Sequence, residues 1–262
     1  VGELGLPIML RELALLPKGI VLVTGPTGSG KSTTMAALVN HANRTRAAHI
    51  LTIEDPIEFV YGPGKSLVRQ REVGTHTEGF APALRAALRE DPGVIVVGEL
   101  RDPESTSLAL EAAETGHLVF GTLHTPSAAD TIERILHMFP TERAPLIRSS
   151  LAQSLETVLS LNLVVRRDGA GRVLAMESLV ATAAVRNMIR DGKTHQLMNV
   201  MQTGRAYGMR TMDDHLSELV EADLITAEAA LTRARNRESF RNRHPELRER
   251  RAGALLTAGT TP

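Results

Sequence analysis

A glycine-rich segment that ends in a lysine and a hydroxyl is the clearest chemical pattern in this sequence. It reads GPTGSGKST and fits G-x-x-x-x-G-K-[ST]. Glycines let the backbone wrap so that successive N–H groups point at phosphate oxygens, and a following helix adds its dipole. The segment therefore predicts a P-loop that binds ATP with Mg²⁺. The expected nucleotide-binding residues are Gly25, Thr27, Gly28, Ser29, Gly30, Lys31, Ser32 and Thr33.

Two side chains of this loop have distinct chemistry. The Lys31 ammonium can reach the β- and γ-phosphates, and the Ser32 hydroxyl can bind Mg²⁺. A glycine-rich turn can also do no more than link two elements. Here an apolar segment, 20–23, precedes the loop and a helical pattern, 31–43, follows it. That setting favours the phosphate-binding interpretation.

Carboxylates follow two other apolar segments. In the usual Walker B pattern four apolar residues precede an Asp and then often a Glu. Here Gly98 takes the Asp position after 94–97, and Glu99 falls in the register of the catalytic glutamate. Glu99 is predicted to orient water or to bind Mg²⁺ through water; a glutamate in a loop facing solvent is the plainer alternative.

Glu54 closes the segment 49–53 and is expected to reach the same phosphates, because ligands of open α/β sheets lie beyond the carboxyl ends of the strands. It could compensate for the Asp missing before Glu99. Asp55 is explained equally well by turn chemistry at Asp55-Pro56. How Glu54 and Glu99 divide the work is left open by the sequence.

Two histidines flank the apolar segment 118–123. His124 follows it, at the expected phosphate end, and is predicted to be a catalytic residue that senses the γ-phosphate through a hydrogen bond. His117 precedes the segment and should lie at the opposite end of the sheet. Either histidine could instead be a hydrogen-bonded core residue.

The elements that must position these residues alternate along the chain. This alternation predicts an α/β fold with a mainly parallel sheet. Strands are expected at 20–23, 49–53, 67–73, 94–97 and 118–123, and helices at 6–16, 31–43, 80–89, 103–114 and 128–138.

The pattern changes after Pro140. A long helix is expected over 143–159, then a hairpin of 161–165 with 172–180, then an almost wholly helical stretch. We therefore expect three parts. These are an ATPase core at 1–180, a small C-terminal helical lobe at 181–237 and a flexible Arg-rich tail at 238–262, which is either a solvated end or a polyanion-binding segment.

Composition excludes several classes of protein. The chain has 262 residues, with Lys+Arg 30 balanced by Asp+Glu 30, no cysteine and 3% aromatic residues. Disulfides and thiolate zinc sites are therefore impossible. No apolar run reaches the ~18 residues of a membrane span. Neutral charge and few aromatic residues argue against a nucleic-acid binder.

Four motifs together resemble the secretion ATPases of type II secretion and type IV pili. They are GPTGSGKSTT, ILTIEDPIEF, ALREDPGVIVVGELRD and AETGHLVFGTLHT, which match the family's Walker A, Asp box, Walker B and His box. The resemblance covers about Leu6 to Arg237. It implies a RecA-like P-loop NTPase core and ATP hydrolysis.

Within this family the chain is most similar to the members that retract type IV pili in twitching motility. AVRNMIRD at 184–191 resembles their AIRNLIRE motif, with departures at Val185, Met188 and Asp191, and 67–73 also matches their pattern. Extension and type II secretion members usually carry a four-cysteine zinc site, which this sequence lacks. Alternatives within the family are an accessory retraction ATPase or another secretion ATPase.

The resemblance also implies partners and a location. It implies a homohexameric ring in the cytoplasm, peripheral at the inner membrane, docked on an inner-membrane pilus platform protein without inserting into the bilayer. No nucleic-acid partner is expected. Alternatives of a different class are a nucleic-acid-dependent RecA-like motor and a nucleotide-binding regulatory module without turnover.

The family's N-terminal PAS-like domain is absent, and the chain begins with Val1. We therefore expect a fragment that binds ATP and hydrolyses it weakly. The inter-subunit arginines that the resemblance places around that domain cannot be assigned.

The segment 184–191 has two faces if it is helical. Val185, Met188 and Ile189 share an apolar face that is expected to pack on the core. Arg186 and Arg190 are spaced i, i+4 and form a basic face, expected to be free to meet a partner and to couple the motor to retraction.

Overall fold

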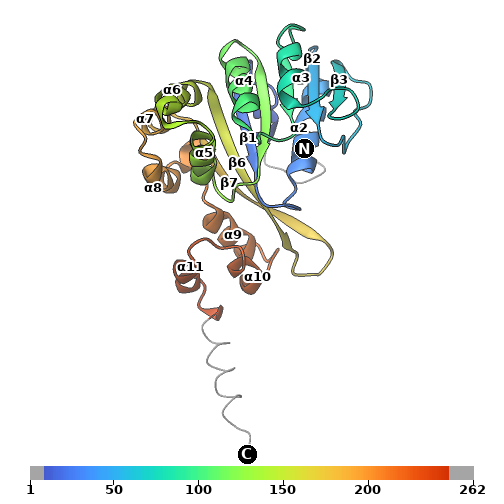
Figure 1. Cartoon of the computed structure of the whole chain (residues 1–262). Coiled ribbons are helices and arrows are strands. Elements are labelled where there is room, and N and C mark those ends of the chain that lie inside the picture. The colour runs from blue at the N-terminus through green and yellow to red at the C-terminus, as the bar shows by residue number, and fades with distance from the viewer. Residues whose placement is uncertain (1–8, 248–262) are drawn as a thin grey trace, which may run out of the picture.

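A seven-stranded sheet organises the computed structural model, which describes residues 9–247 (Figure 1). The strand order is β3-β2-β4-β5-β1-β6-β7, and every neighbouring pair is parallel except β6 with β7. The strands are β1 (Gly19–Thr24), β2 (His49–Glu54), β3 (Leu67–Glu72), β4 (Val94–Val97), β5 (Leu118–Leu123), β6 (Leu155–Val165) and β7 (Arg172–Val180). The predicted α/β class with a mainly parallel sheet is confirmed.

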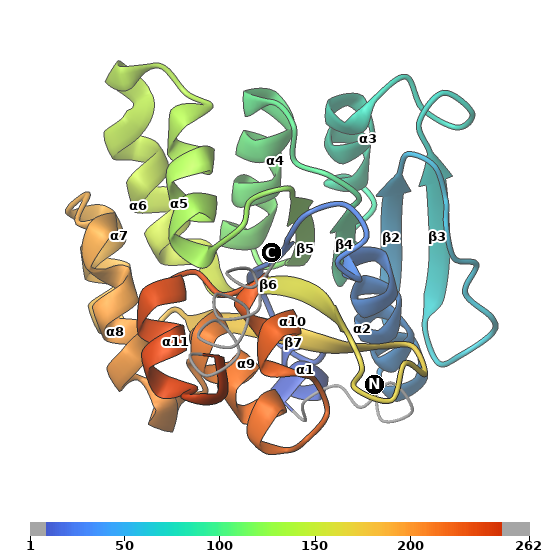
Figure 2. The same cartoon turned by 90° about the horizontal axis from the view of Figure 1, so that it is seen from below.

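Helices cover both faces of the sheet. They are α1 (Met9–Leu13), α2 (Lys31–Thr45), α3 (Phe80–Ala87), α4 (Pro103–Glu114), α5 (Ala128–His137), α6 (Ala144–Ser154), α7 (Ala183–Arg190), α8 (Leu197–Thr203), α9 (Met212–Glu221), α10 (Ala227–Leu231) and α11 (Arg237–Arg243). Figure 2 shows α3, α4, α5 and α6 in a row along one face, with α1 and α2 on the other. Within the described residues no helix combines the length and the apolar character of a membrane span.

Alternation along the central strand β1 explains the two layers. Ile20 and Leu22 belong to the core beneath α3–α8, whereas Val21 and Val23 belong to the core beneath α1 and α2. All four side chains are fully buried. A strand buried on both faces reads as a continuous apolar run, which is why its position was predictable.

The long helix expected over 143–159 is wrong. Helix α6 ends at Ser154, and Leu155 begins β6, which pairs with β1 and extends into the predicted hairpin with β7. A short apolar run is compatible with either a helix or a strand by periodicity alone. The open edge of β1 decides in favour of a strand.

The helices after β7 belong to two different cores. Val185 and Ile189 of α7, together with Leu197 of α8, pack in the same cluster as the sheet residues. This confirms the expected packing of the apolar face of α7. Residues from Met212 to Phe240 instead form a cluster of their own with residues of the β6–β7 hairpin. The division of the chain at 181 stays a prediction.

The Arg-rich segment expected to be flexible from 238 begins with ordered structure. Helix α11 spans Arg237–Arg243, and its Phe240 is fully buried. The Phe240 ring stacks on His244 with 4.3 Å between centroids. These contacts attach 238–247 to the helical lobe. The remainder of the expected tail, 248–262, lies outside the described residues.

A partly buried histidine of α9, hydrogen-bonded to β7, gives a pH prediction. His215 Nδ1 accepts a hydrogen bond from the Met176 N–H at 2.9 Å. The pKa of His215 is lowered to about 4, mainly by burial and also by Arg210, while the Met176 carbonyl oxygen at 3.2 Å from Nδ1 and Glu218 act in the opposite direction. The folded state therefore binds fewer protons than the unfolded state between pH 6.5 and 4. Stability should fall as the pH drops through this window.

The loss expected from His215 is on the order of 3 kcal/mol at pH 4 relative to neutral pH. Denaturant titrations at several pH values would measure it. His215→Asn keeps a hydrogen-bond acceptor but does not titrate, so its stability should depend less on pH in this window. An unchanged pH dependence in that variant would show that other groups cause the effect.

Candidate nucleotide-binding site

The P-loop joins β1 to α2 through backbone conformations that favour glycine. Gly28 and Gly30 have φ of 74° and 95°, and Gly25 has φ of 140°. A Cβ at Gly25 would lie 2.5 Å from the Leu161 carbonyl oxygen, so this glycine also allows a close approach of β6. No side chain of the described residues caps α2. Its first-turn N–H groups therefore point toward the position where phosphate is expected.

A cavity of about 460 Å³ lies between this loop and the carboxyl ends of the neighbouring strands. It gathers most of the predicted site from four separate segments of the chain. The predicted residues that line it are Thr27, Gly28, Gly30, Lys31, Ser32, Thr33, Glu54, Glu99 and His124.

Gly25 and Ser29 do not line this cavity. Ser29 is 3% exposed, and its hydroxyl has no hydrogen-bond partner among the described residues. That oxygen would lie 2.6 Å from a Cβ at Gly25. The Ser29 side chain thus packs behind the loop, and only its backbone remains a candidate for contact with phosphate.

Lys31 lies on the rim of the loop. Its Nζ donates to the carbonyl oxygens of Gly25 at 2.8 Å and Pro26 at 3.0 Å, and it lies 3.4 Å from His124 Nδ1. Burial lowers the pKa of Lys31, while the charges of Glu99 and Glu58 raise it. The ammonium therefore donates to carbonyl oxygens whose place as acceptors phosphate oxygens can take.

Glu99 and His124 form a second contact across the cavity. His124 Nε2 lies 3.5 Å from Glu99 Oε2, so the imidazole bridges Lys31 and Glu99. The Glu99 side chain is 20% exposed. Glu99 therefore faces the cavity and does not face solvent as a loop glutamate would.

The Glu54 side chain is held by hydrogen bonds from residues of β2 and β3 at the edge of the sheet. Its Oε1 accepts hydrogen bonds from the Thr52 hydroxyl at 2.7 Å and from Gln70 Nε2 at 3.1 Å. Gln70 belongs to β3, which pairs with β2 in parallel. The two carboxylates thus differ: Glu54 is held by neutral donors, whereas Glu99 meets basic groups.

Gly98, at the position where an aspartate was expected, lies close to the backbone of β2. Its N–H donates to the Ile53 carbonyl oxygen at 2.8 Å, and a Cβ at this position would lie 3.1 Å from the same oxygen. The Thr122 hydroxyl also donates to the Gly98 carbonyl oxygen. Close packing of β4 between β2 and β5 therefore leaves little room for a side chain at 98.

Sequence reasoning missed Arg101 as a site residue. Its Nε donates to Glu99 Oε2 at 2.6 Å, and its guanidinium lies 3.7 Å from Asp55, for which the sequence left turn chemistry and a site role open. All three line the cavity. The available signal was an arginine two residues after Glu99.

His117 lies at the opposite end of β5, as predicted, with Nδ1 at 3.0 Å from the Ala112 carbonyl oxygen.

The basic face expected to be free on α7 is not free at Arg186. The Arg186 guanidinium donates to the carbonyl oxygens of Ala152 and Gln153, each at 2.9 Å, and to Glu156 Oε1 at 3.0 Å. Arg186 therefore satisfies carbonyl groups at the end of α6. Arg190 contacts only Asn187, on its own helix, among the described residues.

This difference separates the two arginines experimentally. Arg186→Ala is expected to destabilise the protein by about 1–3 kcal/mol, because it removes charged hydrogen bonds from partly buried carbonyl groups. Arg190→Ala should change stability by less than about 0.5 kcal/mol. Denaturant unfolding measures both. Equal, small effects would show that the α6 contact contributes little.

The fold and the site together define a P-loop NTPase with a RecA-like core. The chain belongs to the type II/IV secretion system protein family, whose family model matches residues 7–254.

Individual relatives agree with this assignment. The chain is 58% identical over 238 residues to a twitching motility protein of Neisseria gonorrhoeae and 53% identical over the same length to the type IV pilus retraction ATPase PilT of Pseudomonas aeruginosa. Each match covers 91% of this chain, and 64% and 69% of the relatives. A crystal structure of the pilus retraction motor PilT with bound ADP superposes with a TM-score of 0.85 at 49% identity, covering 91% of this chain and 67% of that one. The chain thus spans about two thirds of these relatives.

Proposed function

We propose that this chain is the ATP-hydrolysing part of a motor that drives type IV pilus retraction in twitching motility. The observation that carries the proposal is the convergence of Lys31, Glu99 and His124 beside the P-loop in one cavity. The similarity to PilT supports retraction as the use of that site.

The residues present fit ATP with Mg²⁺. Positive φ at the loop glycines and the uncapped start of α2 within the described chain suit phosphate oxygens. Ser32 would hold Mg²⁺, which supplies positive charge to the β- and γ-phosphate oxygens. Lys31 would move from the loop carbonyls to phosphate.

The remaining groups would act on the attacking water and on the γ-phosphate. Glu99, held by Arg101 and next to His124, would orient the water and contact Mg²⁺ through water. His124 would donate a hydrogen bond to the γ-phosphate. Glu54, fixed on β2, would add a second carboxylate beside the water. Positioning and charge stabilisation supply most of the catalysis in phosphoryl transfer.

The proposed motor is a homohexameric ring in the cytoplasm, peripheral at the inner membrane and docked on a pilus platform protein. Sedimentation of the full protein with a non-hydrolysable ATP analogue tests the ring. A hexamer is expected, and a monomer at all concentrations would contradict this assembly.

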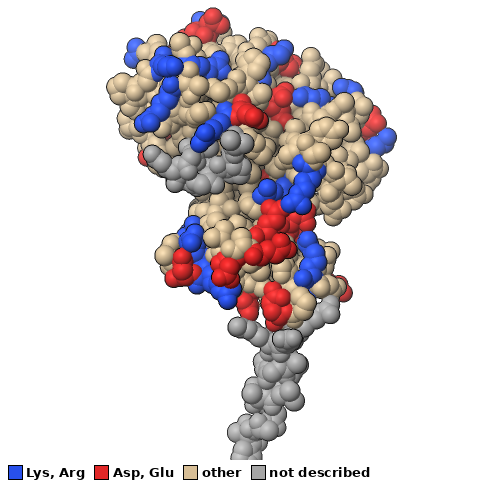
Figure 3. Space-filling model, turned by 180° about the vertical axis from the view of Figure 1, so that it is seen from behind, with Lys and Arg blue, Asp and Glu red and all other residues tan. Residues whose placement is uncertain are grey.

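Two assays separate retraction from other uses of the same core. ATP turnover should be insensitive to DNA, in keeping with the scattered basic side chains on the face shown in Figure 3 and with equal numbers of acidic and basic residues. The gene should also restore twitching to a strain lacking its retraction ATPase. ATP turnover that DNA stimulates would favour a nucleic-acid motor. ATP binding without turnover would favour a regulatory module. ATP turnover without restored twitching would favour another secretion ATPase or an accessory retraction ATPase.

The coupling role proposed for α7 is best tested at Arg190, because Arg186 has a structural contact. Arg190→Ala should keep ATP affinity and stability yet abolish twitching. Normal twitching would remove Arg190 from the proposal.

A further inference from the structure

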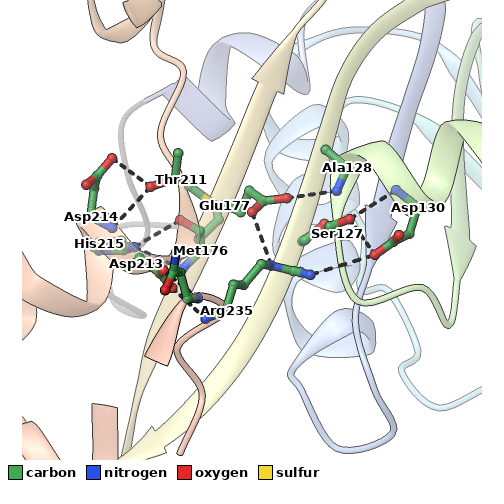
Figure 4. A network of polar contacts seen from close by, with 12 residues as sticks. Ser127, Ala128, Asp130, Met176, Glu177, Thr211, Asp213, Asp214, His215 and Arg235 are labelled. Carbon is green, nitrogen blue, oxygen red and sulfur yellow. Dashed lines mark hydrogen bonds and ion pairs between the residues drawn. The ribbon is translucent and has the colours of Figure 1, made fainter. Parts of the chain in front are cut away.

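A buried carboxylate joins the nucleotide-binding half of the protein to the C-terminal helices. Glu177 lies on β7 and is 0% exposed. Its Oε1 accepts a hydrogen bond from the N–H of Ala128 at 2.8 Å. Ala128 is the first residue of α5. The carboxylate therefore contacts both the first turn of α5 and Arg235, which precedes α11 (Figure 4).

Arg235 is the counter-charge of this carboxylate. Its Nε lies 3.5 Å from Glu177 Oε2, and its Nη1 lies 3.7 Å from Asp130 Oδ2 on α5. Oε2 has no direct hydrogen bond among the described residues. Burial raises the pKa of Glu177, while Arg235 and the Ala128 N–H lower it. The Glu177 side chain is fully buried, whereas the Arg235 side chain is 26% exposed, so the arginine is the partner that can be changed with less effect on folding.

The contact is fixed on the side of the C-terminal helices. The Asp213 carboxylate accepts the backbone N–H groups of Arg235 at 2.7 Å and Asn236 at 2.9 Å. Asp213 is itself in the first turn of α9. The segment between α10 and α11, which carries Arg235, is therefore attached to the first turn of α9.

The contact also borders the loop that carries His124. Between His124 and α5 lies a short loop, tied by a 2.7 Å bond between the Thr125 and Thr131 hydroxyls and by Ser127, which caps α5. Arg235 also borders a cavity of about 310 Å³ together with His124 and with Pro26 of the P-loop. A shift of the connector would therefore act on the loop that carries His124.

We infer that Glu177 and Arg235 are positioning residues through which the C-terminal helices hold the His124 loop in the geometry required for ATP turnover. This inference rests on the proposed ATPase function, and it adds a structural connection between the nucleotide-binding site and the C-terminal helices. It predicts that breaking the contact slows the chemical step and leaves nucleotide binding by the P-loop intact.

The main variant is Arg235→Gln in the full protein. It removes the charge and keeps most of the side-chain length. The kcat for ATP should fall about tenfold or more, with KM within about twofold, because a small misplacement of a reacting group is costly. Arg235→Lys should recover part of kcat. Arg237→Ala, an exposed arginine two residues along, is the matched control and should behave like the parent.

Glu177→Gln tests the other partner. In the double variant with Arg235→Gln, the loss should be no larger than that of the slower single variant, because both act through one contact. A parent-like kcat in Arg235→Gln, or a loss explained entirely by a lower melting temperature, would overturn the inference.

A second measurement does not depend on turnover. In the parent, a non-hydrolysable ATP analogue should slow amide exchange both in 125–131 and in 211–236. In Arg235→Gln the slowing should persist in 125–131 and be lost in 211–236; retention in both segments would contradict the inference. Absence of ATP turnover in the parent would instead remove the proposed function, so the two failures are distinguishable.

Discussion

Lys31→Ala is expected to weaken ATP binding by about 10- to 100-fold and to remove detectable hydrolysis. The ammonium is the cationic group of the P-loop, and charged hydrogen bonds contribute about 1.5–3 kcal/mol each. In the structure it lies 2.8 Å and 3.0 Å from loop carbonyl oxygens that phosphate can replace. A fluorescent ATP analogue and a phosphate-release assay would measure binding and turnover.

The fold should tolerate the Lys31 substitution. Its loop contacts are to carbonyl oxygens at the edge of the cavity, so the melting temperature should stay close to that of the parent. Lys65→Ala, which truncates an exposed lysine elsewhere, is the control and should leave both ATP assays unchanged. ATP affinity and turnover that remain at the parent level in Lys31→Ala would disprove the assignment of the P-loop lysine.

Glu99→Gln is expected to leave ATP bound and to slow turnover by about 100-fold or more. The substitution keeps size but removes the charge that orients water and meets Mg²⁺ through water. Glu99 is the carboxylate that contacts His124 and Arg101 in the cavity. Single-turnover hydrolysis, measured beside ATP affinity, separates the chemical step from binding.

Glu54→Gln should also slow turnover by about 100-fold or more. Its carboxylate accepts two neutral hydrogen bonds, so the amide must reorganise contacts with Thr52 and Gln70. The ratio of the two variants' rates would therefore divide the labour between the carboxylates. Glu111→Gln on the exposed face of α4 is the control. If either Glu54→Gln or Glu99→Gln hydrolyses ATP at the parent rate, that carboxylate is not catalytic.

The nucleotide-binding end of the fold was predictable from the sequence. Strands β4 and β5 have the bounds expected from their apolar runs, and α4 begins at Pro103 as its start signal indicates. Glu54 ends one such strand, and Glu99 and His124 come just after two others; the three meet in one cavity because parallel strands bring their carboxyl ends to one edge. A local pattern was sufficient because burial on both faces leaves a continuous apolar signature.

Other features were decided only by tertiary structure. Leu155–Val165 forms a strand because β1 offers an open edge, a side chain at position 98 would crowd the Ile53 carbonyl oxygen of β2, and Arg186 contacts the end of α6. Glu177 and Arg235 are 58 positions apart in number and meet only through the packing of α5, β7 and α9. The pattern of apolar and polar residues in a segment predicts which of its own side chains are buried. The partner across a sheet edge or a helix terminus depends on segments distant in the chain, and only the folded structure brings them together.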